Sequence, residues 1–102
     1  MKKLTVTAML AASLALTTSV HAADVAAGKA MAEDVCSDCH GADGKGDADF
    51  PAIGGLAVDK FTKAIQEYQD GTRTKNAKMT KAAKKLTAAD VANLAAYYVT
   101  LK

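Results

Sequence analysis

The chain of 102 residues lacks tryptophan, and it contains only five aromatic side chains, one proline and two cysteines. No segment alternates between apolar and polar residues as a half-buried β-strand does, and this leaves an all-α fold. Internal repeats and a long linker are also absent, so we expect one domain. A domain this small and this poor in aromatic residues has little apolar surface of its own. We therefore expect a buried cofactor to supply part of the core.

The first 22 residues have the pattern of a secretory signal peptide. Two lysines at positions 2 and 3 precede an uncharged stretch that runs to Val20, and small residues at Val20 and Ala22 suit cleavage after Ala22. The alternative is an uncleaved membrane anchor, but six serine and threonine residues dilute the apolar run. We therefore predict a signal peptide at 1–22, a domain at 23–102 without a membrane span, and a periplasmic location.

The predicted mature chain has no net charge, but its charges are segregated. Removal of the two leading lysines leaves 11 basic and 11 acidic side chains, which argues against nucleic-acid binding. Between Asp24 and Asp49 there are seven acidic residues and two lysines, whereas Arg73 to Lys85 holds six basic residues and no acidic one. This asymmetry predicts an oriented electric field.

Helical periodicity marks three segments. The first runs from Asp24, a candidate N-cap, to about Val35; the second runs from about Val58 to Gln69; and the last begins at Thr87. Five glycines and the proline make residues 41–55 a loop. Residues 73–81 form a polar segment, which we expect to be flexible.

The run Cys36-Ser37-Asp38-Cys39-His40 matches the attachment sequence of c-type haem. Two thiols three residues apart at the end of a helix can reach the two vinyl groups of one porphyrin. The adjoining imidazole of His40 then lies under the iron as an axial ligand.

Three other interpretations of the same cysteines are weaker. A thioredoxin-like dithiol requires a neighbouring βαβ pattern, and no strand is visible in the sequence. A zinc site needs about four ligands, whereas only Cys36, Cys39 and His40 remain after His21 leaves with the signal peptide. A disulfide between the cysteines would not require His40.

The second axial ligand follows by elimination. The predicted mature chain has no second histidine and only two methionines, Met31 and Met79. Met31 lies five residues before Cys36 on the helix that leads into the motif, so we expect it in the core. Met79 lies 39 residues after His40, in a segment long enough to reach the opposite face of a haem. A His/Met pair raises the reduction potential of the iron.

These residues resemble the class I c-type cytochromes, in particular the small soluble bacterial members, over nearly all of Asp24 to Lys102. The resemblance implies a cytochrome c fold of three to four helices and loops wrapped around one covalent haem. It also implies that Gly28 of the first helix packs against Tyr97 of the last. The carbonyl of Pro51 is expected to accept a hydrogen bond from the ligand imidazole.

With both axial positions of the iron filled, no site is left for a substrate. We therefore expect a monomeric electron carrier rather than an enzyme, cycling between Fe(II) and Fe(III), whose partners are other redox proteins. The basic residues around Met79 are candidates for docking an acidic partner, or else they form an ordinary solvated face: Arg73, Lys75, Lys78, Lys81, Lys84 and Lys85. Two alternatives stay open, a haem-bearing subunit of a larger oxidoreductase, and a gas-binding haem protein or haem enzyme if Met79 does not bind the iron.

Overall fold

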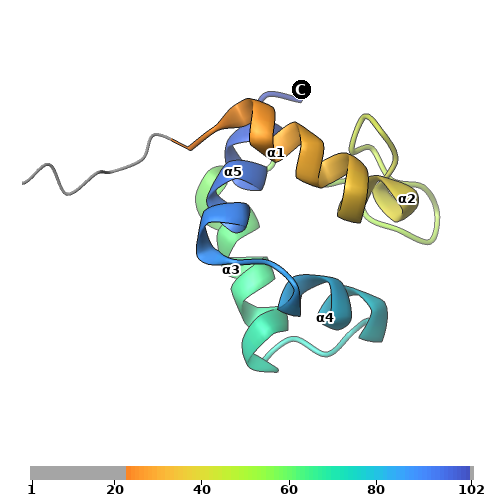
Figure 1. Ribbon diagram of the computed structural model, residues 1–102. Helices are drawn as coiled ribbons and strands as arrows, with labels where there is room; N and C mark the ends of the chain where they lie inside the picture. Colours follow the sequence, from red (N-terminus) through yellow and green to blue (C-terminus); the bar gives the residue numbers. More distant parts are fainter. Residues whose placement is uncertain (1–22, 102) are drawn as a thin grey trace, which may run out of the picture.

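The computed structural model describes residues 23–101, and every regular element in that range is helical (Figure 1). The elements are α1 (Val25–Met31), a π-helix η1 (Ala32–Cys36), α2 (Ser37–His40), α3 (Val58–Asp70), α4 (Ala77–Lys84) and α5 (Ala88–Tyr98). The prediction of an all-α fold is confirmed. The predicted signal peptide at 1–22 lies outside the described residues. Within them, no helix is both long and apolar enough to cross a membrane.

Local signals place the helix ends where the sequence predicted them. The Asp24 carboxylate accepts a hydrogen bond from the backbone N–H of Ala27 and caps α1. At the start of α5, Thr87 and Asp90 form a reciprocal capping box. Gly71 ends α3 in the left-handed conformation, with φ of 83°.

The segment between α3 and α5 corrects one expectation. We predicted a flexible polar segment at 73–81, but a helix, α4, runs from Ala77 to Lys84. The side chain of Asn76 accepts hydrogen bonds from the backbone N–H groups of Lys78 and Met79, which starts the helix. Its buried residue is a small one, Ala83, so the apolar stripe is too weak to be seen in the sequence.

Helix α5 is the centre of the core, because it packs against both α1 and α3. Its apolar face is buried, with Leu94 and Tyr98 among the least exposed side chains. The ring of Tyr98 stacks on Phe61 of α3, with 5.6 Å between ring centroids. A Cβ at Gly28 of α1 would overlap the carbonyl oxygen of Asn93, so the two helix backbones can meet only at a glycine.

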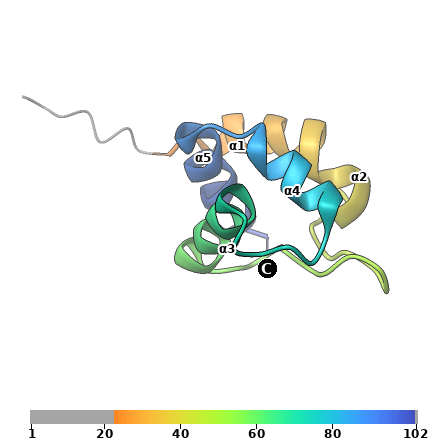
Figure 2. The ribbon, with the colours of Figure 1, turned by 90° about the horizontal axis from the view of Figure 1, so that it is seen from below.

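Helix α4 is held away from the first helical segment. It packs on α3, whereas α1 packs on α5. Figures 1 and 2 show α1 and α2 on one side of the molecule and α4 on another, with α3 and α5 joining them at one end. This arrangement leaves the candidate site between α2 and α4.

Candidate functional site

The first wall of the site is built by the Cys-x-x-Cys-His motif. Helix α1 passes without a break into the π-helix and then into α2, and its hydrogen-bond ladder widens at the step where Ser37 N–H donates to the Ala32 carbonyl. A π turn holds one residue more than an α turn, so it changes the direction of the residues that follow. Gly28 can thus face α5 while Cys36, Cys39 and His40 face the cavity.

His40 is buried, and one of its ring nitrogens is already engaged. Its Nδ1 lies 2.8 Å from the carbonyl oxygen of Pro51. Because a carbonyl oxygen can only accept, Nδ1 must carry the hydrogen, and Nε2 of the neutral ring keeps a free lone pair. The ring of Phe50 meets the imidazole edge-on, with centroids 6.3 Å apart. The structure thus contains the Pro51–His40 contact that the resemblance implied.

The loop that carries Pro51 depends on Gly46, which the sequence analysis did not single out. Gly46 has φ of 63°, and its backbone N–H donates to the His40 carbonyl at 2.8 Å. A Cβ at this position would overlap the Phe50 carbonyl oxygen and lie 2.7 Å from the carbonyl carbon of Pro51. Only glycine therefore lets the loop fold back closely enough to reach the imidazole.

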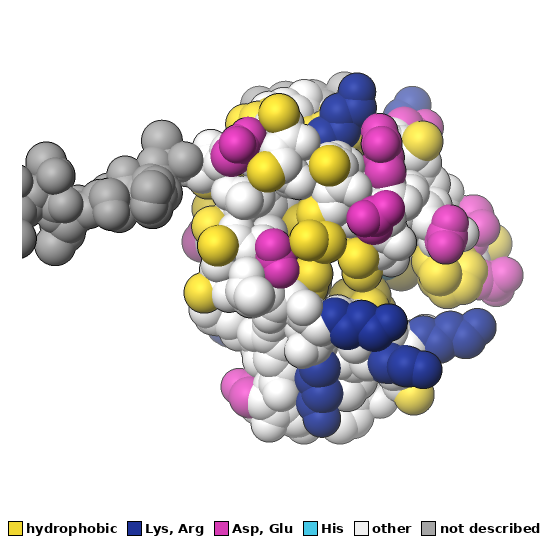
Figure 3. Space-filling view, in the orientation of Figure 1, with side chains coloured by type: hydrophobic (Ala, Val, Ile, Leu, Met, Phe, Trp, Pro, Cys, Tyr) yellow, Lys and Arg dark blue, Asp and Glu magenta, His cyan; other side chains and the backbone are white. Residues whose placement is uncertain are grey.

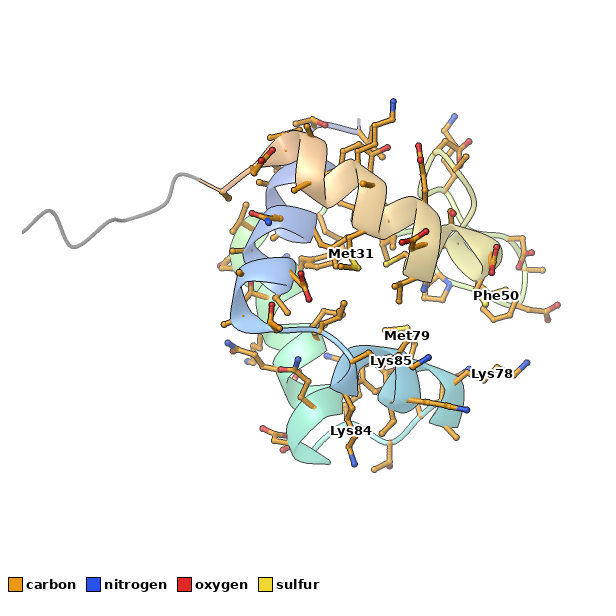
Figure 4. All side chains as sticks on the ribbon, in the orientation of Figure 1. Met31, Phe50, Lys78, Met79, Lys84 and Lys85 are labelled. Carbon is orange, nitrogen blue, oxygen red and sulfur yellow. The ribbon has the colours of Figure 1, made fainter. Side chains whose placement is uncertain are left out.

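The second wall carries Met79. Its side chain is half-buried, and Figure 4 shows it pointing from α4 into the space between α4 and the segment formed by α1 and α2. Met31 points from α1 toward the core instead, against which it packs (Figure 4).

A side-chain amide holds α4 in this position. The Gln69 amide nitrogen donates to the carbonyls of Ala83 at 2.9 Å and Leu86 at 3.1 Å. The Ala83 carbonyl lies in the last turn of α4 and also accepts from the backbone N–H of Leu86, whereas the Leu86 carbonyl lies two residues beyond the helix. Gln69 thus ties the end of α3 to the end of the Met79 helix, a role that its position at a helix end did not reveal.

The two walls enclose a cavity of about 400 Å³, within the range of ligand and cofactor sites. Cys36, Cys39, His40, Pro51 and Met79 all line it, so the structure brings the five predicted site residues together. The remaining lining is mostly apolar: Val35, Phe50, Ile53, Leu56, Phe61, Ile65 and Leu86 are among its members. Two thiols, an imidazole and a thioether around an apolar cavity form a donor set that fits a covalently held haem.

Tyr98 is buried in the core, but its hydroxyl also serves the site. It donates a hydrogen bond to the sulfur of Cys36. Burial raises the pKa of the Cys36 thiol, and the Tyr98 hydrogen bond offsets part of that rise. Burial and the neighbouring Cys36 in turn raise the pKa of Tyr98. Tyr98 thus orients the thiol at the inner end of the motif.

The basic residues near Met79 are not equivalent. The guanidinium of Arg73 donates to the Glu67 carboxylate at 2.8 Å and lies 5.6 Å from the centre of the Tyr68 ring. The Glu67 hydrogen bond raises the pKa of Arg73. The charge of Arg73 is therefore paired with a carboxylate of the same chain. Lys78, which also lines the cavity, is exposed.

Comparison with known proteins identifies the family. The family model for cytochrome c matches residues 25–102. The chain belongs to the cytochrome c family. Cytochrome c4 of Pseudomonas aeruginosa is 41% identical over 104 residues, which span the whole of this chain and 50% of that protein. Cytochrome c-554(548) of Halomonas halodenitrificans is 39% identical over 80 residues, covering 76% of this chain and 95% of that protein.

The fold agrees with this assignment. The structure of cytochrome c4 from Acidithiobacillus ferrooxidans matches 83% of the chain and 54% of that protein, with a TM-score of 0.71 and 29% identity. The thiosulfate dehydrogenase TsdBA of Marichromatium purpuratum matches 76% of the chain but 19% of its own, with a TM-score of 0.72 and 30% identity. The predictions of a small bacterial c-type cytochrome, of a cytochrome c fold and of covalent haem c are confirmed.

The relatives differ in length. This cytochrome spans half of the Pseudomonas aeruginosa cytochrome c4, and 31% of the thiosulfate dehydrogenase electron acceptor of Thiomonas intermedia. It spans all of cytochrome c-554(547) of Halothiobacillus neapolitanus, to which it is 31% identical. The cytochrome c unit therefore occurs among these relatives both as nearly a whole protein and as part of a longer one.

Proposed function

We propose that this cytochrome is a periplasmic electron carrier whose single haem c is bound axially by His40 and Met79. The observation that carries the proposal is that both side chains line one apolar cavity from different helices, α2 and α4. When bound, the haem supplies one-electron chemistry by cycling between Fe(II) and Fe(III). The roles assigned to the surrounding residues follow from their contacts.

His40 suits the role of a permanent ligand. Its bond to the Pro51 carbonyl leaves Nε2 as the nitrogen with a free lone pair and holds the ring in one orientation. Burial of the ring limits competition from water. We propose that Cys36 and Cys39 form the thioether links, since they line the same cavity from the helix that carries His40.

Met79 suits the role of the second ligand because a thioether is a soft donor that favours Fe(II), and a His/Met pair raises the potential. The Asn76 cap and the Gln69 amide fix the two ends of its helix, so the sulfur would be presented by a rigid element. A ligand that does not have to move keeps the reorganisation between redox states small.

Replacement of Met79 tests the ligand. Met79→Ala should keep the haem covalently attached, remove the sulfur-to-iron band at the red end of the visible spectrum, lower the reduction potential and allow the reduced protein to bind carbon monoxide. Axial ligands set haem potentials over a range of about 0.8 V, so the shift is measurable by spectroelectrochemistry.

Met31→Leu is the matched control. Met31 packs against the core, and leucine has a similar volume, so spectrum and potential should stay unchanged. A potential that is the same in Met79→Ala and in the parent protein would contradict ligation by Met79 and would favour a gas-binding haem protein.

The periplasmic location rests on the predicted signal peptide. Mass spectrometry of the protein recovered from a periplasmic fraction should find a chain that starts at Ala23 and carries one haem. A chain that retains Lys2 and Lys3 would contradict both the cleavage and the domain boundary.

We further propose that partners dock at the mouth of the cavity through Lys78, which lines it, and the lysines that share its face of α4. Because exposed charges act through solvent, the rate of electron transfer to an acidic redox protein should fall as ionic strength rises. A rate that is flat or rises with salt would exclude the lysines as a docking surface. Arg73 should contribute little, since Glu67 already neutralises it.

A second candidate is a haem-bearing subunit of a larger oxidoreductase. It is favoured by the likeness to thiosulfate dehydrogenase TsdBA, of which the chain matches 19%. Purification from the native host at low salt separates the two candidates, because a subunit would elute with a large partner and a free carrier would elute alone.

A further inference from the structure

The mouth of the cavity carries opposite charges on its two sides. Asp38 of α2 and Asp49 of the following loop line it on the His40 side, and Lys78 lines it on the Met79 side. All three side chains are exposed. Figure 3 shows acidic side chains on the α1, α2 and loop side of the hollow and basic side chains on the α4 side, with further basic side chains at the upper edge of the view, away from the hollow.

The basic side is an ordered stripe. Lys78, Lys81 and Lys85 are spaced at i, i+3 and i+7, so they share one face of α4 and its last turn. Lys84 points away from the cavity on the same helix (Figure 4). We call Lys78, Lys81 and Lys85 the basic rim, and Asp38 and Asp49 the acidic rim.

Neither rim is neutralised within the molecule. Among residues 23–101 the one ion pair joins Arg73 to Glu67, and it includes no rim residue. The rims are also too far apart in the fold to pair with each other, because the cavity lies between them. Their charges are therefore available to a docking partner.

We propose that this mouth is self-complementary, so that two copies of the cytochrome dock face to face and exchange an electron. A two-fold axis that lies in the docked interface, perpendicular to the line that joins the two rims, places the acidic rim of each copy opposite the basic rim of the other. Every attractive contact then occurs twice. A mouth rimmed by one sign of charge would instead repel its own copy.

The encounter is transient, because exposed ion pairs are individually weak and the rims are narrow. This proposal rests on the proposed function in one respect: the faces that dock are taken to be those through which the haem transfers its electron. The exchange is balanced without another reactant: the Fe(II) copy loses one electron, the Fe(III) copy gains it, and no bond forms or breaks.

Electron self-exchange is measured from NMR line widths in mixtures of the oxidised and reduced protein. Steering by complementary charges raises association rates by about 10–10³-fold at low salt. We expect the self-exchange rate to fall at least about tenfold between 10 and 500 mM ionic strength. A rate that stays flat or rises with salt would overturn the proposal.

Charge reversal on each rim gives a stricter test. Lys78→Glu lowers the charge of the basic rim from +3 to +1, and Asp49→Lys brings that of the acidic rim from −2 to zero, so each variant alone should exchange more slowly than the parent protein at low salt. A mixture of reduced Lys78→Glu with oxidised Asp49→Lys should exchange faster than either variant alone, because the intact acidic rim of the first variant then meets the intact basic rim of the second. Lys84→Glu, a change of the same charge on the face of α4 that points away, should leave the rate unchanged. A mixture no faster than either variant alone would refute the face-to-face arrangement.

A measurement without electron transfer separates this proposal from the proposed function. Translational diffusion of the fully reduced protein at millimolar concentration should be slower at 10 mM than at 500 mM ionic strength, and Lys78→Glu should reduce the difference. Diffusion that is equal at both salt concentrations contradicts docking even if Met79 binds the iron. A visible spectrum without the sulfur-to-iron band contradicts Met79 ligation even if docking is observed.

Discussion

The contact between α1 and α5 supports a quantitative prediction for Gly28→Ala. A methyl group at this position would overlap the Asn93 carbonyl oxygen and approach the Tyr97 Cβ to 2.9 Å. Both atoms are close to or part of the α5 backbone, so no side-chain rotation can relieve the overlap. The two helices must move apart, and the buried Ala32 one turn later loses part of its packing.

Two effects of opposite sign decide the size of the change. Alanine in place of glycine in a helix interior stabilises it by about 1 kcal/mol. Overpacking a closely packed contact costs about 1–3 kcal/mol, and a backbone clash belongs at the upper end of that range. We therefore expect Gly28→Ala to lower the free energy of unfolding by about 2 kcal/mol, and the Tm by about 8–16 °C for a domain of this size.

Thermal and guanidinium unfolding of the haem-loaded protein, followed by circular dichroism, measure this change. Ala30→Gly is the matched control, because Ala30 is exposed on the same helix and reports the helix-propensity effect alone, about 1 kcal/mol. If Gly28→Ala is as stable as the parent protein or more so, the close helix contact does not limit this position and the reasoning is wrong.

Three further changes test the supports of the site. Gly46→Ala should weaken the His40–Pro51 contact, because φ of 63° and the Phe50 carbonyl exclude a methyl group; its potential should shift and its thermal stability should fall. Asn76→Ala should cost about 1 kcal/mol by removing the cap of α4, whereas Asn76→Asp should retain most of that stability in a denaturant titration. Gln69→Leu should cost about 1–3 kcal/mol, since the Leu86 carbonyl loses its Gln69 donor and the Ala83 carbonyl keeps only its backbone donor, and should increase hydrogen exchange at α4 more than at α1.

The parts of this cytochrome that were predictable rest on interactions within a few residues. Asp24, Thr87 with Asp90, and Gly71 act on the backbone next to them, so the ends of α1, α5 and α3 could be located from the sequence. The Cys-x-x-Cys-His spacing likewise specifies a cofactor by local geometry. The assignment of Met79 needed only a count of the remaining ligand types, and it stays a prediction.

Helix α4 shows where local reasoning fails. Apart from Met79, its apolar face is made of small side chains, and the helix is stabilised by Asn76 at one end and by Gln69, 14 residues before Ala83, at the other. The Asn76 cap could have been found as a start signal before Ala77, but the Gln69 contact depends on how α3 and α4 pack. A periodicity search therefore missed a helix that tertiary contacts hold in place.

The sequence by itself determined the cofactor, the helical class and the supply of iron ligands, because these depend on residue type and short-range spacing. Only the tertiary structure decided that Gly46 lets the Pro51 carbonyl reach His40 and that Arg73 forms an ion pair with Glu67. It also decided that acidic and basic residues lie on opposite sides of one cavity. Those contacts join residues whose separation in the chain says nothing of their separation in space, and packing alone brings them together.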